Sequence, residues 1–254
     1  MDWSALVTLT HGLEQFLLPN ACVSCDRPVG SGTADRLVCS LCIARLLALG
    51  AGCLRCQQPL PLIGPCRFCA DWPAALKTVR SAVWMSDESR RMIHHLKYEG
   101  YWRVGMDLAD VMVRHVPKPV AGTLLPIPLG THRARERGYN QAACLARGLA
   151  VRWGMDVDDR TLGRTTETRS QTTLTPDERA RNVAGVFAAT KGQEEPTSSV
   201  ILVDDVLTTG ATLASAAGTL ERAGWSQIHA VTFARVMPFE VSVGQHDPQR
   251  TVRS

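Results

Sequence analysis

The stretch VILVDDVLTTGATL, residues 200–213, decides the fold class of this chain. It opens with four aliphatic residues, as strands buried on both faces do, and the run stops at the adjacent carboxylates of Asp204 and Asp205. A small, hydroxyl-rich loop follows, and after it Leu213, Ala217 and Leu220 repeat at helical spacing. The pattern predicts a strand, a loop and a helix, the unit from which parallel α/β sheets are built.

The loop between this strand and this helix has the composition of a phosphate site. A loop that leads into a helix presents unpaired backbone N–H groups and the positive end of the helix dipole. Gly210 allows close approach of a ligand to the backbone, and hydroxyl donors come from Thr208, Thr209 and Thr212. The two aspartates would repel a phosphate, so we expect them to bind the vicinal hydroxyls of an attached sugar. The ligand implied is a ribose 5-phosphate unit.

Other phosphate motifs do not fit this stretch. The Gly-Lys-Ser/Thr ending of a P-loop is missing, and no GxGxxG pattern follows a strand. An acidic strand end with an ordinary Ser/Thr helix cap would explain one aspartate and one threonine, but not the whole run.

The rest of the chain alternates in the same way. Apolar stretches and helical periodicity predict strands at 78–86, 122–129 and 228–236, and helices at 87–100, 102–115 and from residue 140 onward. Residues 130–141, GTHRARERGYNQ, are expected to form a basic loop, and residues 168–187 a polar segment that ends in a short apolar stretch. We therefore expect a parallel α/β sheet, with ligands bound beyond the carboxyl ends of its strands.

Eight of the nine cysteines form four CxxC pairs, and Cys144 stands alone in an expected helix. Two such pairs can supply the four sulfurs of a tetrahedral zinc site, so two structural Zn²⁺ ions are expected on Cys22, Cys25, Cys39, Cys42, Cys53, Cys56, Cys66 and Cys69. Sequential pairing is favoured, with a cross-braced arrangement as the alternative. Disulfides or a thioredoxin-type redox pair are the other interpretations, which a cytosolic setting and the fourfold repetition disfavour.

Bulk properties indicate a folded protein. The 254 residues are 45% hydrophobic and 20% charged, and the net charge of +4 permits phosphate or nucleic-acid partners without requiring them. No apolar run approaches the length of a membrane span. Residues 1–19 contain no Lys or Arg, unlike a secretory signal, and fit an amphipathic helix. We expect a cytoplasmic protein that does not bind membranes.

These motifs together resemble known families. VILVDDVLTTGAT is similar to the phosphoribosyl pyrophosphate (PRPP) motif of type I phosphoribosyltransferases. The cysteine-rich segment and the ordered motifs HLKYEG, PIPL, RERGYNQA, TRSQTTL and ERARNVAGVF resemble the ComF family over residues 20–237. That family includes proteins needed for natural transformation by imported single-stranded DNA, and others named for gluconate use.

The resemblance implies a fold and a division of the chain. The fold is a type I phosphoribosyltransferase-like parallel sheet with an N-terminal cysteine-rich zinc-ribbon domain. The expected parts are an N-terminal helix at 1–19, a double zinc ribbon at 20–73, a phosphoribosyltransferase-like domain at 74–237 and a flexible tail at 238–254.

The resemblance also implies roles for individual residues. Asp204 and Asp205 would contact the ribose hydroxyls, and the 5-phosphate would be enclosed by Thr208, Thr209, Gly210, Ala211 and Thr212. The loop around Arg133, Arg137 and Gly138 would lie near the pyrophosphate, although a solvated basic loop is the alternative. Arg169 and Gln171 would belong to a loop that closes over the site, with Arg169 and the two aspartates as catalytic candidates. Mg²⁺ would arrive with PRPP.

Two functions remain open at this stage. The first is binding of PRPP or ribose 5-phosphate by a protein that acts in uptake or processing of single-stranded DNA, with that DNA and a DNA-uptake helicase as candidate partners. The second is active PRPP-dependent phosphoribosyl transfer to an unknown acceptor, in nucleotide or carbohydrate metabolism. Tyr98, Tyr101, Trp102 and Tyr139 are available to stack DNA bases in the first case.

Overall fold

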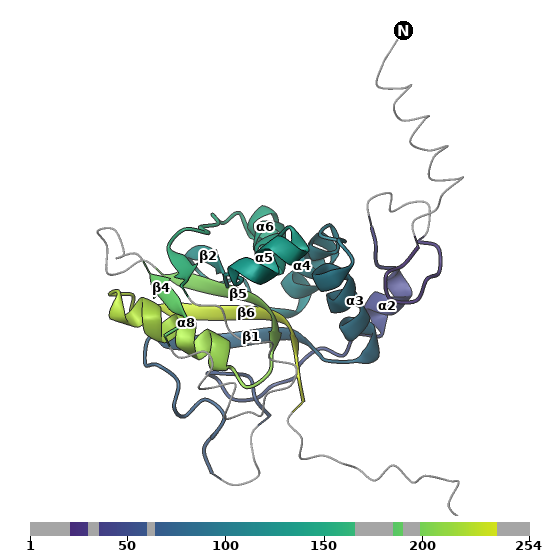
Figure 1. The fold of residues 1–254 in the computed structure, drawn as a ribbon. Helices are drawn as coiled ribbons and strands as arrows, with labels where there is room; N and C mark the ends of the chain where they lie inside the picture. The colour runs from purple at the N-terminus through teal and green to yellow at the C-terminus, as the bar shows by residue number, and fades with distance from the viewer. Residues whose placement is uncertain (1–20, 30–35, 60–63, 166–184, 190–198, 238–254) are drawn as a thin grey trace, which may run out of the picture.

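A computed structural model describes residues 21–29, 36–59, 64–165, 185–189 and 199–237 (Figure 1). The expected N-terminal helix at 1–19 and the tail at 238–254 lie outside the described residues. So do Arg169, Gln171 and nearly all of the polar segment 168–187.

Four parallel strands form the central sheet, which confirms the expected fold class. In sheet order these are β1 (Leu76–Trp84), β6 (Ile228–Arg235), β5 (Val200–Leu207) and β2 (Thr123–Pro126). At mid-sheet Val203 of β5 lies between Pro126 of β2 and Val231 of β6. The two central strands are almost continuously buried because both faces of the sheet are covered.

Helices cover the two faces unequally. Ile201 and Val203 pack in a core with α3 (Asp87–Tyr98), α4 (Val104–His115) and α6 (Gln141–Trp153). Val200 and Leu202, which alternate with them along β5, pack in a second core with α8 (Ala211–Arg222). Figure 1 shows α4 and α6 on one side of the sheet and α8 on the other.

The cysteine-rich segment contributes to both of these cores. Val23, Val38 and Leu46, around the short helix α2 (Ser40–Ala44), join the core that contains α4. Trp72, further along the segment, joins the core that contains α8. Few large apolar side chains belong to the segment alone, so its folding depends on the sheet domain, and a metal held by its cysteines would add to its stability.

Asp107 attaches the first part of this segment to α4. Its Oδ2 accepts hydrogen bonds from the backbone N–H groups of Leu37 at 2.7 Å and Val38 at 3.0 Å. The carboxyl group is buried, and burial raises its pKa. Two charge-assisted hydrogen bonds offset the cost of burying it.

The structure corrects two expected element boundaries. The strand at the opening stretch does not stop at Asp204, because pairing with β6 continues through Val206 and Leu207. The basic loop 130–141 contains a helix, α5 (Thr131–Arg137), which ends at Gly138 with a left-handed φ of 75°. No residue of α5 is buried, so the apolar periodicity that reveals helices in a sequence is missing here.

One small sheet was not expected. β3 (Leu162–Arg164) and β4 (Phe187–Ala189) pair antiparallel, bringing together residues on either side of the polar segment. Three-residue strands leave no readable alternation in a sequence. Across the described part of the chain, no helix combines the length and the apolar character needed to cross a membrane.

Candidate functional site

Asp205 is the centre of a polar cluster built from three elements. It lies on β5 with 3% of its surface exposed. Its Oδ2 forms an ion pair with Lys97 Nζ, from the end of α3, and its Oδ1 accepts a hydrogen bond of 3.3 Å from Gln141 Nε2, at the start of α6. Both partners reach the carboxyl half of β5, the position expected for ligands in a parallel sheet.

The two adjacent carboxyl groups have opposite electrostatics. Burial alone would raise the pKa of Asp205, but the Lys97 ammonium more than offsets this effect and lowers it. Burial raises the pKa of Asp204 well above its ordinary value, and the neighbouring charge of Asp205 adds to the effect. Asp205 therefore holds its negative charge more firmly, and Asp204 takes up a proton first as the pH falls.

The expected phosphate loop, Thr208–Thr212, connects β5 to α8. Gly210 precedes the first residue of α8 with φ 80°, and Thr208 is exposed while Gly210 is buried. The first turn of α8 contains no acidic residue, and its first N–H groups have no partner within the helix. The loop therefore offers an anion the donors and the dipole end that the sequence predicted.

The arginine-rich helix α5 lies next to this cluster through Arg137. Arg137 donates from Nη1 to Gln141 Oε1 at 2.9 Å, and its guanidinium lies 4.9 Å from the centre of the Tyr98 ring. Gln141 therefore connects Arg137 to Asp205. Arg133 is half-buried on the same helix, and Gly138 ends the helix.

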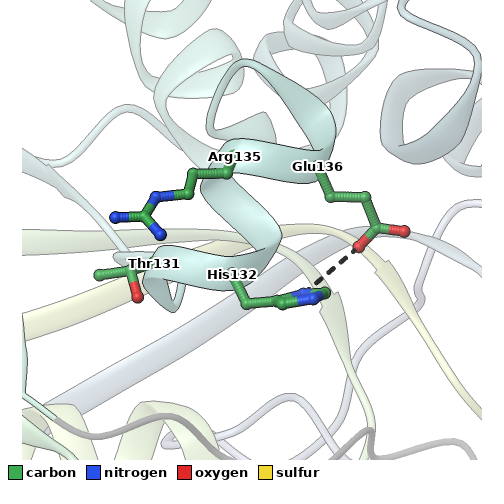
Figure 2. A pocket seen from close by; sticks show the side chains of 4 residues that line it. All are labelled: Thr131, His132, Arg135 and Glu136. Carbon is green, nitrogen blue, oxygen red and sulfur yellow. Dashed lines mark ion pairs between the residues drawn. The ribbon is translucent and has the colours of Figure 1, made fainter.

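A hollow of about 550 Å³ opens on α5 (Figure 2). It is lined by Thr131, His132, Arg135 and Glu136. Figure 2 shows the ion pair between His132 and Glu136, whose Nδ1 and Oε2 atoms are 3.9 Å apart. Arg135, and not the predicted Arg133 or Arg137, is the arginine that lines it.

Sequence reasoning missed Lys97 and Gln141. Both lie within motifs that carry the family resemblance, HLKYEG and RERGYNQA, but no role could be assigned to either from spacing alone. Lys97 is one of only four lysines in the chain, which in an arginine-rich sequence is the one available signal.

The eight paired cysteines form two clusters. The sulfurs of Cys22, Cys25, Cys39 and Cys42 (the first cluster) all lie within 4.8 Å of one another, as do those of Cys53, Cys56, Cys66 and Cys69 (the second cluster). Sequential pairing is thus observed, and the cross-braced alternative is not.

The sulfur geometry of both clusters fits a metal. Distances of 3.8 Å between Cys25 and Cys39 and between Cys53 and Cys69 match the edge of a tetrahedron with zinc–sulfur bonds of about 2.3 Å, which is about 3.8 Å. None of the cysteines is in a disulfide. Although burial raises the pKa of Cys39 and Cys53, backbone hydrogen bonds bring each to about 7, which favours the thiolate that zinc requires. Burial raises the pKa of Cys22, Cys42, Cys56 and Cys69, so these four would lose their protons on binding a metal.

Other candidate groups serve the packing. Cys144 is buried against Gly105 of α4, and burial raises its pKa, which keeps it a protonated thiol. Tyr139 donates its hydroxyl to the backbone oxygen of Leu96 at 2.7 Å, so its polar end is used within the fold.

The other three aromatic candidates are not part of the packing: Tyr98, Tyr101 and Trp102 remain exposed, at 58%, 44% and 55%.

Comparisons with known proteins identify the domain to which this site belongs. Residues 135–243 match the phosphoribosyl transferase domain family. The chain is 27% identical to DNA utilization protein YhgH of Salmonella typhi, over 87% of this chain and 99% of that protein. It is 36% identical to competence protein F of Haemophilus influenzae, over 44% and 49% of the two chains, and 28% identical to competence protein ComFC of Bacillus subtilis, over 75% and 80%.

Among solved structures, orotate phosphoribosyltransferase from Aeropyrum pernix aligns with a TM-score of 0.31 and 20% identity, over 61% of this chain and 68% of that one.

The fold and the matched domain define the chain as a protein with a phosphoribosyltransferase domain, preceded by two four-cysteine clusters. The relatives that it resembles include proteins named as DNA utilization and competence proteins, which agrees with the likeness to the ComF family that its motifs predicted.

Proposed function

We propose that this protein binds PRPP or ribose 5-phosphate at the carboxyl end of β5, and that it acts in the uptake or processing of single-stranded DNA. The observation that carries the ligand site is the continuity of β5, the phosphate loop and α8. Within nine residues it presents two carboxyl groups followed by a hydroxyl-rich loop and the start of a helix without an acidic first turn. A sugar bearing a phosphate matches that sequence of groups.

Each part of the ligand has a partner of suitable chemistry. The ribose hydroxyls would donate to Asp204 and Asp205, and the 5-phosphate would accept from the phosphate loop. Arg133, Arg137 and Gly138 would lie toward the pyrophosphate, because Arg137 approaches the acidic pair through Gln141. Mg²⁺ would be carried by the pyrophosphate and sugar oxygens, since Lys97 already pairs with Asp205 Oδ2.

If transfer occurs, an acceptor displaces pyrophosphate at the anomeric carbon. The side chains of this site would then orient the sugar and stabilise the positive charge that develops on it. Asp205 would supply the negative charge, because Lys97 keeps it ionised, whereas the less buried Asp204 is more open to the sugar itself. Arg169 remains the proposed catalytic residue of the loop that would close over the site.

A role in handling single-stranded DNA is favoured by a second surface. Tyr98, Tyr101 and Trp102 are exposed at the end of α3 and in the turn that follows, and Arg137 lies over Tyr98. Exposed rings beside a guanidinium are the combination on which unpaired bases stack. Relatives named as DNA utilization and competence proteins support this assignment.

Calorimetric titration of the zinc-loaded protein with PRPP and Mg²⁺ tests the ligand site. Saturable binding is expected, and it should be lost when Asp204→Asn and Asp205→Asn are combined in a protein that remains folded at the temperature of the titration. Unchanged affinity in the double variant would refute the assignment of the ribose hydroxyls.

Single-stranded DNA is tested separately by fluorescence anisotropy over a range of salt concentrations. A steep loss of affinity with salt is expected, because binding releases counterions from phosphates. A Tyr98→Ala, Trp102→Ala variant should bind at least about tenfold more weakly, given the worth of a stacked base. Binding that is absent, or insensitive to salt, would contradict the role in DNA handling.

A further inference from the structure

Trp72 packs directly against the phosphate loop. A Cβ atom placed on Gly210 would lie 2.4 Å from Trp72 Cζ2, closer than such atoms approach, and 3.0 Å from Cε2, which is also tight. The indole therefore rests on the bare backbone of the loop, at a residue whose φ of 80° suits glycine. Trp72 is 9% exposed, so the fold holds it in this position.

The second cysteine cluster determines where Trp72 lies. Trp72 follows Cys69 by three residues, and its backbone N–H donates to Cys69 O at 3.4 Å. Arg55, which lies between Cys53 and Cys56 in the sequence, donates to Cys69 O at 2.8 Å and to Trp72 O at 3.1 Å. Residues of both CxxC pairs of the cluster therefore form hydrogen bonds with the backbone that carries Trp72.

Aromatic contacts also hold the Trp72 ring in place. The ring of Phe68 meets the Trp72 ring edge-on, with centroids 5.6 Å apart. Phe68 in turn lies 4.5 Å beneath the buried guanidinium of Arg235, which donates to Cys56 O at 2.6 Å. Arg235 ends β6, beside the last residue of β5.

The segment that begins at Trp72 also follows the helix behind the loop. A Cβ on Gly218 of α8 would meet Pro73 at 3.5 Å, and Glu221 Oε1 accepts a hydrogen bond of 2.8 Å from the Ala75 backbone. Residues 72–75 thus contact Gly210, which precedes α8, and lie along the helix as far as Glu221 in its last turn. The first cluster packs in the opposite core, through Asp107 of α4.

We propose that metal in the second cluster, and not in the first, sets the conformation of the phosphate loop, with Trp72 as the positioning residue that connects them. The inference rests on the proposed function for its consequence, which is that loss of the second metal lowers the affinity for PRPP. Because metal supplies much of the folding free energy of such a short segment, its loss would release Trp72 from Gly210.

Hydrogen–deuterium exchange on the full zinc-loaded chain tests the coupling without a ligand. The variants are Cys66→Ser in the second cluster and Cys25→Ser in the first, both at half-buried positions, and Trp72→Leu, which leaves all eight cysteines in place. Amides of residues 207–213 should exchange at least about tenfold faster in Cys66→Ser and in Trp72→Leu, and at the wild-type rate in Cys25→Ser. Metal analysis should find two zinc equivalents retained in Trp72→Leu.

The outcomes separate this inference from the proposed function. Wild-type exchange of the loop in Trp72→Leu, or equal exchange in the two cysteine variants, would overturn the coupling whether or not PRPP binds. If the wild type binds no PRPP, the proposed function fails while exchange still decides the coupling. Should Cys66→Ser unfold, which faster exchange throughout β5 and β6 would reveal, Trp72→Leu decides alone, with Trp72→Phe expected to restore most of the protection.

Discussion

Lys97 forms an ion pair with Asp205, and this contact joins the end of α3 to the carboxyl half of β5. The Asp205 side chain is 5% exposed and that of Lys97 23%, so the pair is largely shielded from water. The contact keeps a carboxylate charged at the position where the ribose is proposed to bind. It also brings an ammonium group close to any phosphate that enters.

Replacing Lys97 by methionine should weaken PRPP binding at least about tenfold, because it leaves the buried Asp205 without its partner and removes a positive charge near the ligand, and about 1.4 kcal/mol is a factor of ten. Without the ammonium, burial would raise the pKa of Asp205, and a protonated carboxyl group accepts ribose hydroxyls poorly. Calorimetric titration at neutral pH measures the change. Lys77→Met, at an exposed lysine that bonds only its own segment, is the matched control and should bind as the wild type does. Equal affinities in the two variants would remove Lys97 from the site.

The difference between Lys97 and the aspartates shows what the sequence could supply. Asp204, Asp205 and the phosphate loop are consecutive, so local chemistry sufficed to predict a phosphate site and a strand–loop–helix unit. Lys97 and Gln141 come from two other elements and meet Asp205 only through the tertiary fold. No spacing in the sequence encodes that meeting.

The same distinction explains the remaining differences. Sequential pairing of the CxxC motifs was favoured because a short loop joins the two motifs of each cluster, and the structure confirms this pairing. The helix α5 was missed because it buries nothing, and Trp72 was missed because its contact with Gly210 crosses from one part of the chain to another.

Gly210→Ala should destabilise the protein by about 1–3 kcal/mol, whereas Gly218→Ala should stabilise it by about 0.4–1 kcal/mol. The first substitution meets both the Trp72 ring and a left-handed φ; the second adds a methyl group inside α8, with its nearest contact at an ordinary 3.5 Å. Urea unfolding of the zinc-loaded proteins compares them. A stable Gly210→Ala variant would mean that the indole does not rest on the loop.

His229 should make stability depend on pH below neutrality. It shares a hydrogen bond of 2.7 Å with Thr78 Oγ1, and burial, followed by the charges of Arg80 and Lys77, lowers its pKa below 6.5. The unfolded chain therefore binds a proton first as the pH falls, so this group removes stability as the pH drops through 6.5 toward the folded pKa.

Unfolding midpoints measured from about pH 7 to pH 5 in the His229→Asn variant should fall less steeply than in the wild type. Zinc release in acid affects both proteins alike, so their difference isolates His229. His115→Asn, at an exposed histidine of α4, should keep the wild-type slope. Parallel slopes in all three proteins would show that His229 is not shielded from protons.

Asp107→Ala should loosen the first cysteine cluster and leave the second unaffected. The substitution removes the acceptor of two backbone N–H groups, at Leu37 and Val38, and leaves both donors inside the core that contains α4. Unpaired buried donors cost about 1–3 kcal/mol each. Because Val38 immediately precedes Cys39, the unpaired donors destabilise the folded, metal-bound form of this cluster and should lower its affinity for zinc.

Titration with a zinc chelator, followed by a colorimetric zinc indicator, resolves the effect. One of the two zinc equivalents should leave Asp107→Ala at about tenfold lower chelator concentration than it leaves the wild type, because each 1.4 kcal/mol is a factor of ten. The second equivalent should be released as before. Asp87→Ala, at an exposed acid in the first turn of α3, is the control and should release both equivalents normally. Earlier release of both equivalents from Asp107→Ala would show that the clusters fold as one unit, rather than each against its own face of the sheet.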